Sequence, residues 1–125
     1  MERHLENAGV DYEVKVLSAH RNLEELLDFL KKHSGEYGTV IASAGYSASL
    51  PGLVAAISEV PVLGVPISSS PVRLDALFSM IEMPKGVPLA VCSYDKAGLI
   101  NASLLALKIC GEKEKFETLK KDIYK

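Results

Sequence analysis

Helical and strand-like patterns alternate along the whole of this chain, and no repeat, low-complexity tract or linker divides it. Alternation of this kind predicts a parallel sheet covered by helices on both faces, because helices form the crossovers between parallel strands. The strand-like stretches are residues 12–17, 39–43, 62–65 and 89–93. The helical stretches are residues 1–8, a segment that begins after Asn22, and residues 52–58, 74–83, 99–109 and 112–125.

Three of the helical stretches carry further information. Asn22 is expected to cap the second helix, with Glu25 completing a capping box. The helix of residues 99–109 is apolar around most of its circumference, which indicates a subunit interface. Residues 112–125 are mostly charged and are interpreted as a terminal helix that docks by one apolar stripe. The buried stripe of the second helix is expected to be Leu23, Leu26, Leu27 and Leu30.

The length of 125 residues and an apolar content of 48% fit one domain, residues 1–125, with a substantial core. A net charge of −2 offers no basic field for nucleic acid. No apolar run reaches the ~20 residues that span a bilayer, and the first residues lack the pattern of a signal peptide. We therefore expect a cytoplasmic protein without nucleic-acid or membrane partners. Cys92 and Cys110 lie in apolar segments and are interpreted as small buried hydrophobes.

The ends of the predicted strands are rich in small and hydroxyl-bearing residues. Open parallel sheets bind ligands beyond the carboxyl ends of their strands. Small residues let a ligand approach backbone amides, hydroxyls offer neutral hydrogen bonds, and Arg21 is suited to a phosphate. The pattern predicts a neutral pocket with one cation, for a phosphorylated small molecule. The four strand ends are Ser18-Ala19-His20-Arg21, residues 43–49, Ser68-Ser69-Ser70 and Ser93-Tyr94.

His20 is the histidine that follows directly after a predicted strand. Imidazole titrates closer to neutral pH than other side chains, so His20 is the natural proton carrier of such a site. Its placement fits equally well a histidine that merely helps to cap the helix after Asn22. The chain has no metal-binding HExxH pattern, no P-loop or GxGxxG, and no GxSxG elbow, so metal centres and serine hydrolases have little support.

Six motifs follow one another along almost the whole chain. They are Ser18-Ala19-His20-Arg21, Ala42-Ser43-Ala44-Gly45 running into Leu50-Pro51-Gly52-Leu53-Val54-Ala55, Pro61-Val62-Leu63-Gly64-Val65-Pro66, Asp75-Ala76-Leu77-Phe78-Ser79 with Met83-Pro84, Gly86-Val87-Pro88, and Lys96-Ala97-Gly98 before Asn101-Ala102. In this order they resemble the PurE family, which comprises N-carboxyaminoimidazole ribonucleotide mutases and aminoimidazole ribonucleotide carboxylases of de novo purine synthesis.

The resemblance implies a flavodoxin-like three-layer αβα sandwich, assembled as a homo-octamer with its sites where subunits meet. It implies carboxyl transfer from the exocyclic amine of an imidazole ribonucleotide to a ring carbon, with carbon dioxide released and recaptured in a closed pocket. Neither a metal nor an organic cofactor is implied. His20 corresponds to the general acid/base and Arg21 to the phosphate-binding arginine. The remaining expected substrate-binding residues are Ser18, Ala19, Ser43, Ala44, Gly45, Ser49 and Leu50.

The chain departs from the family pattern at three places. The first strand and its Gly-Ser-x-Ser-Asp loop are missing, so we expect a parallel sheet without that strand and with its two neighbours unpaired. Tyr46 stands where a glycine is usual, and Ser49 replaces a histidine. Arg73 also replaces a glycine, either as a second phosphate contact or as a solvated surface residue.

These departures leave alternatives to the mutase reading. Loss of the histidine at Ser49 is compatible with a carboxylase-type reaction. A PurE-like domain also occurs in a carboxylase of nicotinate adenine dinucleotide, and Tyr46 would suit stacking on a different ring. In a third reading, the chain is a non-catalytic paralogue that binds a nucleotide or serves as an assembly partner.

Overall fold

Three parallel strands form the sheet of the computed structural model, which describes residues 1–33, 35–69, 71–72 and 74–125. The strands are β1 (Val40–Gly45), β2 (Val62–Ile67) and β3 (Ala90–Val91), in the order β1-β2-β3. β1 and β2 pair along six residues, from Val40 opposite Val62 to Gly45 opposite Ile67. The predicted parallel sheet is therefore confirmed. Ser70 and Arg73, whose roles the sequence left open, lie outside the described residues.

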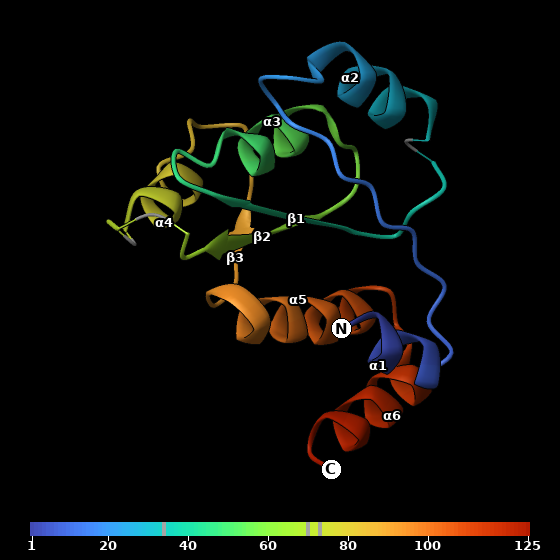
Figure 1. The fold of residues 1–125 in the computed structure, drawn as a ribbon. Helices are drawn as coiled ribbons and strands as arrows, with labels where there is room; N and C mark the ends of the chain where they lie inside the picture. Colours follow the sequence, from blue (N-terminus) through green and yellow to red (C-terminus); the bar gives the residue numbers. More distant parts are fainter. Residues whose placement is uncertain (34, 70, 73) are drawn as a thin grey trace.

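Helices cover both faces of this sheet (Figure 1). α2 (Leu23–Lys32), α3 (Ser49–Ile57) and α4 (Leu74–Ile81) lie on one side, and α5 (Asp95–Ile109) lies on the other. Side chains alternate between the faces, as the pleat of a strand requires. Val62 packs with α2 and α3, whereas Leu63 and Val65 pack with Ala102 of α5. The α/β sandwich follows from this two-sided burial.

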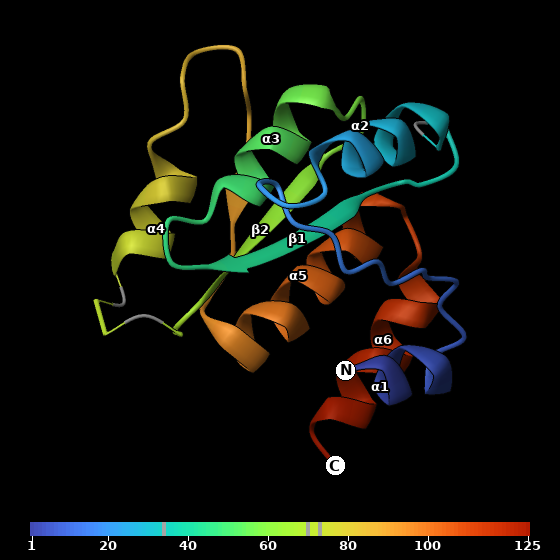
Figure 2. The same cartoon turned by 45° about the horizontal axis from the view of Figure 1, so that its top comes forward.

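The two terminal helices pack together at one end of the molecule, away from α2, α3 and α4 (Figure 2). They are α1 (Glu2–Asn7) and α6 (Lys113–Ile123). Ala8, Leu107 and Leu119 form their shared core with α5. α1 ends as expected just before Gly9, whose φ of 67° lies in the left-handed region that glycine adopts without cost. The prediction that the last helix docks by one apolar stripe is confirmed.

The strand expected at residues 12–17 is absent from the sheet. Val16 is 95% exposed and Val14 is 58% exposed, so neither side chain is packed as in a covered sheet. The segment is held by side chains instead, because Tyr37 donates a hydrogen bond to Glu13 and the Lys15 ammonium lies 5.6 Å from the centre of the Phe29 ring. The carboxylate of Glu13 raises the pKa of Tyr37 to about 12.

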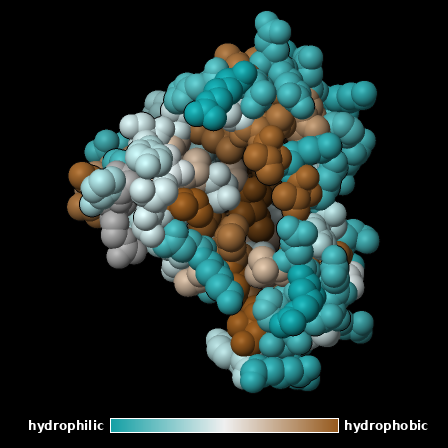
Figure 3. Space-filling model, in the orientation of Figure 1, coloured by the Kyte–Doolittle hydropathy of each residue, from teal (hydrophilic) through white to brown (hydrophobic). Residues whose placement is uncertain are grey.

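β1 is the edge of the sheet on the side where that strand was expected. Backbone groups at an edge have no ladder partner, and a strand forms only where a neighbour supplies one. The unpaired residues 12–17 and the open edge of β1 agree with the expectation of a sheet without the family's first strand. A band of apolar side chains runs over β1 and continues over α5 on this face (Figure 3).

Several smaller expectations are wrong in detail. Only Ala90–Val91 of the expected strand at residues 89–93 pairs with β2. Asn22 precedes α2 but makes no side-chain capping bond, because its Oδ1 accepts a hydrogen bond from the backbone N–H of Ser18 at 3.3 Å. Cys92 is half-buried and Cys110, which follows the last turn of α5, is exposed, so the second is not a core residue. Leu23, at the start of α2, is 43% exposed.

Candidate functional site

A tight turn connects the unpaired segment 12–17 to α2 and carries the motif of residues 18–21. The Ser18 hydroxyl oxygen accepts hydrogen bonds from the backbone N–H groups of His20, at 3.3 Å, and Arg21, at 3.2 Å. The backbone N–H of Asn22 donates to the Ser18 carbonyl at 3.0 Å. Serine hydroxyls commonly fold a turn in this way. Ser18 therefore fixes the backbone from which the His20 and Arg21 side chains project.

The loop between β1 and α3 lies opposite this turn and is shaped by a close approach at Gly45. A Cβ atom at this position would lie 2.1 Å from Ser69 Oγ and 3.3 Å from the Ile67 carbonyl oxygen, so a larger residue fits only if the Ser69 side chain moves. The chain then turns at Tyr46, whose φ of 55° is in the left-handed region. Ala48 is buried against Ala76 and Met80, which anchors the loop before α3 begins.

The turn and the loop flank an open cavity of about 210 Å³. It lies at the carboxyl end of β1, where open parallel sheets bind ligands. Eight of the nine residues proposed from the sequence line it, and only Arg21 is not among the lining residues. The eight are Ser18, Ala19, His20, Ser43, Ala44, Gly45, Ser49 and Leu50.

Three further lining residues, Leu17, Ser47 and Ala48, are not among the nine proposed site residues. Ser47 and Ala48 lie within the strand end of residues 43–49 that the sequence singled out, and Leu17 directly precedes Ser18. The walls of the cavity are made of small side chains and the hydroxyls of Ser18, Ser43, Ser47 and Ser49. Among these lining residues His20, which is exposed, carries the imidazole, the side chain that most often serves as a general acid or base.

The described residues of the other two strand ends do not line this cavity. Asp95, at the start of α5, accepts a hydrogen bond from the backbone N–H of Ser68 at 2.9 Å and a second from its hydroxyl. The loops after β2 and β3 are thereby tied to each other. Ser69 reaches the site only indirectly, where its hydroxyl packs against Gly45. The candidate site is therefore built from two of the four strand ends that the sequence suggested.

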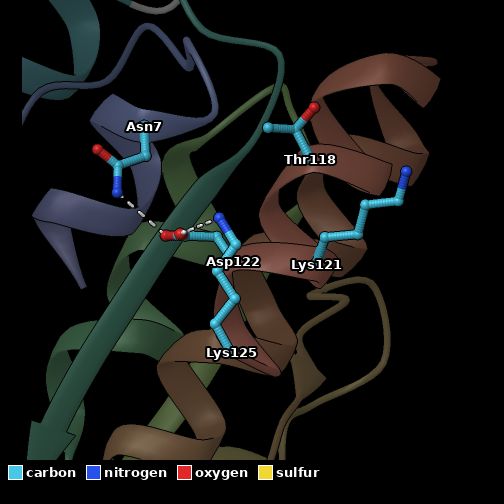
Figure 4. A pocket seen from close by; sticks show the side chains of 5 residues that line it. All are labelled: Asn7, Thr118, Lys121, Asp122 and Lys125. Atoms are coloured by element: carbon cyan, nitrogen blue, oxygen red, sulfur yellow. Dashed lines mark hydrogen bonds and ion pairs between the residues drawn. The ribbon is translucent and has the colours of Figure 1, made fainter.

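A second hollow, of about 400 Å³, lies between α1 and α6 (Figure 4). Its carboxylate, Asp122, is engaged by His4 Nδ1 at 2.7 Å, by Asn7 Nδ2 at 3.2 Å and by Lys125 Nζ at 3.6 Å. The hydrogen bonds from His4 and Asn7 hold the pKa of Asp122 below its usual value. These contacts already satisfy the hydrogen-bonding capacity of the Asp122 carboxylate. The hollow therefore marks where α1 and α6 pack together, and it is a weaker candidate for a functional site than the smaller cavity.

Within the described part of the chain, no group of three or more His, Cys, Asp and Glu side chains could hold a metal ion. No described helix is long and apolar enough to cross a membrane.

Comparison with known proteins places these features in a family. The sequence profile of the family described as AIR carboxylase matches residues 1–124. The N5-carboxyaminoimidazole ribonucleotide mutase of Pseudomonas aeruginosa is 45% identical over 111 residues, which cover 87% of this chain and 68% of that protein. The mutase of the same name from Pyrococcus horikoshii is 46% identical over 114 residues, covering 89% of this chain and 63% of that protein.

The fold agrees with a solved member of the same group. The crystal structure of Treponema denticola PurE matches with a TM-score of 0.80 and 26% identity, covering 98% of this chain and 78% of that one. The chain thus spans roughly two thirds of the length of the curated relatives described above. The flavodoxin-like arrangement and the family resemblance drawn from the motifs are both confirmed. This chain belongs to the AIR carboxylase family, to which the name PurE is also given.

Proposed function

We propose that this chain catalyses carboxyl transfer on aminoimidazole ribonucleotide in purine biosynthesis, as an N5-carboxyaminoimidazole ribonucleotide mutase. The observation that carries the proposal is the cavity, because two segments distant in sequence bring one imidazole and four serine hydroxyls together at the end of β1. The names of the relatives favour this isomerase over a carboxylase of the lyase type, and over the nicotinate adenine dinucleotide and non-catalytic readings.

The cavity suits a reaction that passes through carbon dioxide. The bond between the exocyclic nitrogen and the carboxylate breaks, and carbon dioxide leaves while the nitrogen takes a proton from His20. The ring carbon then attacks carbon dioxide, and the proton that this carbon loses returns to His20. The imidazole ends in its starting state, so no external acid, base or oxidant is consumed. Small neutral walls suit this step, since a pocket of this kind that closes over its substrate confines carbon dioxide and excludes bulk water.

Arg21 is proposed to hold the phosphate of the ribonucleotide. The cavity of about 210 Å³ is small beside the ~300–1,000 Å³ of typical ligand sites. The base and carboxylate are therefore placed inside it, and the ribose phosphate outside. Arg21 is exposed and directly follows His20, so its flexible side chain reaches the solvent beside the lining residues. A guanidinium pairs with a phosphate through two parallel hydrogen bonds.

Self-assembly, with a homo-octamer as the expected form, is part of the proposal. Leu74, Phe78 and Ile81 share one face of α4 and are each about half exposed. Their spacing of four and three residues makes a continuous apolar stripe. Contiguous exposed apolar patches mark interaction sites, and a second copy of this chain is the occupant we propose. α5 adds Leu105 and Ile109, 38% and 44% exposed, which fits the interface expected there.

A cytoplasmic location and a single domain of residues 1–125 complete the proposal. Cys92 and Cys110 are both free thiols, which suits a reducing compartment.

Replacing His20 with Asn should abolish turnover while leaving ligand affinity nearly unchanged. General acid–base catalysis contributes roughly 10²- to 10⁴-fold, so kcat should fall by at least about 100-fold. Turnover is followed as conversion of N5-carboxyaminoimidazole ribonucleotide, and affinity by calorimetry. His33→Asn is the matched control, because His33 ends α2 and pairs with Glu36 away from the cavity. An unchanged kcat in His20→Asn would remove the imidazole from the reaction.

Replacing Arg21 with Ala should weaken ligands that carry a phosphate and spare those that do not. A hydrogen bond to a charged group is worth about 2 kcal/mol, which corresponds to roughly a 30-fold loss of affinity. Calorimetric titration with 5-aminoimidazole ribonucleotide and with its nucleoside separates the two cases. Arg3→Ala is the control, because Arg3 is an exposed arginine of α1 that does not line the cavity. Equal losses for both ligands would assign Arg21 to the structure of the turn.

Replacing Phe78 with Glu should dissociate the assembly, because a charge would be buried in the apolar stripe of α4. Sedimentation velocity should show a shift from a large species towards the monomer, with the helical circular dichroism retained. Tyr124→Glu serves as the control, since Tyr124 is 78% exposed at the end of α6. If Phe78→Glu sediments as the unaltered chain does, the stripe is not a subunit contact.

A further inference from the structure

Tyr46 has an unusual backbone conformation for an aromatic residue. Its φ of 55° places it in the left-handed region, which glycine and asparagine tolerate and which strains other residues. Tyr46 and Asp95 are the described non-glycine residues with a positive φ. Strained backbone persists only where its surroundings enforce it, and it clusters at ligand-binding sites. Neighbouring residues must therefore impose this conformation on Tyr46, and a role in ligand binding would explain why it is kept.

The cause lies in the two neighbours of the turn. The backbone at Gly45 packs closely against the loop after β2, because a Cβ atom there would lie 2.1 Å from Ser69 Oγ and 3.3 Å from the Ile67 carbonyl oxygen. Ala48 is only 2% exposed and packs under α4, and its N–H donates to the Tyr46 carbonyl at 2.9 Å. Held from both sides, the chain has to reverse at residue 46. The backbone of residue 46 is therefore fixed, and this restricts the directions in which its side chain can project.

The position of Tyr46 relative to the cavity indicates a role in ligand binding. Gly45 and Ser47 both line the cavity, whereas Tyr46 between them does not and is 60% exposed. A large aromatic side chain on a rigid turn beside a cavity is available to a ligand at little entropic cost, since it orders only two side-chain torsions. Because the proposed function places the base inside the cavity, a side chain of residue 46 that covers the cavity would meet the base and not the ribose phosphate outside it.

We propose that Tyr46 stacks on the planar ring of the bound ribonucleotide and closes the cavity over it. This inference rests on the proposed function, and it assigns a base-recognition role that small residues at this position would not supply. The hydroxyl-rich walls bind the polar edge of the ring, and the Tyr46 face covers its flat side. Tyr46 is thus a binding residue that selects ligands with an aromatic base over the bare sugar phosphate.

The test compares two ligands and three variants by calorimetry. Base–aromatic stacking predicts that Tyr46→Asn binds 5-aminoimidazole ribonucleotide about 10-fold more weakly than the unaltered chain does, while ribose 5-phosphate binds equally to both. Asparagine tolerates the left-handed backbone, so this variant removes the ring and keeps the turn. Tyr46→Phe should keep the affinity, because the ring face is retained. Tyr46→Gly should lose affinity as the Asn variant does while unfolding at a higher temperature, because it relieves the strain.

Two results would overturn the inference and leave the proposed function standing. One is binding of 5-aminoimidazole ribonucleotide that is the same in Tyr46→Asn as in the unaltered chain. The other is an equal loss of affinity for both ligands, which would mean that the turn and not the ring is responsible. If the unaltered, folded chain binds neither ligand, the proposed function fails and the role of Tyr46 fails with it.

Discussion

The six-residue pairing of β1 with β2 is the interaction on which the rest of the structure depends. β2 is an almost wholly apolar strand whose Leu63 and Val65 are at most 1% exposed, so it must be covered on both faces. Helices from both sides supply that cover, and the register from Val40 to Gly45 then fixes where β1 ends. The cavity sits at that end. The cavity is lined by the last residues of β1, by the turn at Ser18 and by residues 47–50.

The parts of the fold that could be predicted from the sequence are those specified locally. Helical spacing and the apolar run at β2 identified all six helices that the described residues form and the central strand, and the alternation of helices and strands indicated that the sheet is parallel. Residues 12–17 have strand-like composition but form no strand, because a strand also requires a neighbour, and that depends on distant residues. The short β3 and the diverted Asn22 side chain likewise depend on contacts that spacing does not encode.

The residues of the candidate site were predictable for a different reason. Parallel strands place their carboxyl ends together, and the resemblance selected two of those ends. The structure brings eight of the nine proposed residues around one cavity. The tie between Ser68 and Asp95 was not predictable, because it joins two loops through one carboxylate. Nor were the left-handed backbone of Tyr46 and the close approach of Ser69 to Gly45. Such constraints exist only once the loops have packed.

The account's central claim is that the ribonucleotide binds at the end of β1. Backbone amide chemical shifts, recorded by NMR during a titration with 5-aminoimidazole ribonucleotide, test this most directly. The account predicts saturable changes at residues 18–21 and 43–50, with the amides of Thr118 and Lys121 in the hollow between α1 and α6 unaffected. Changes confined to that hollow, or none in a folded chain at millimolar ligand, would contradict it.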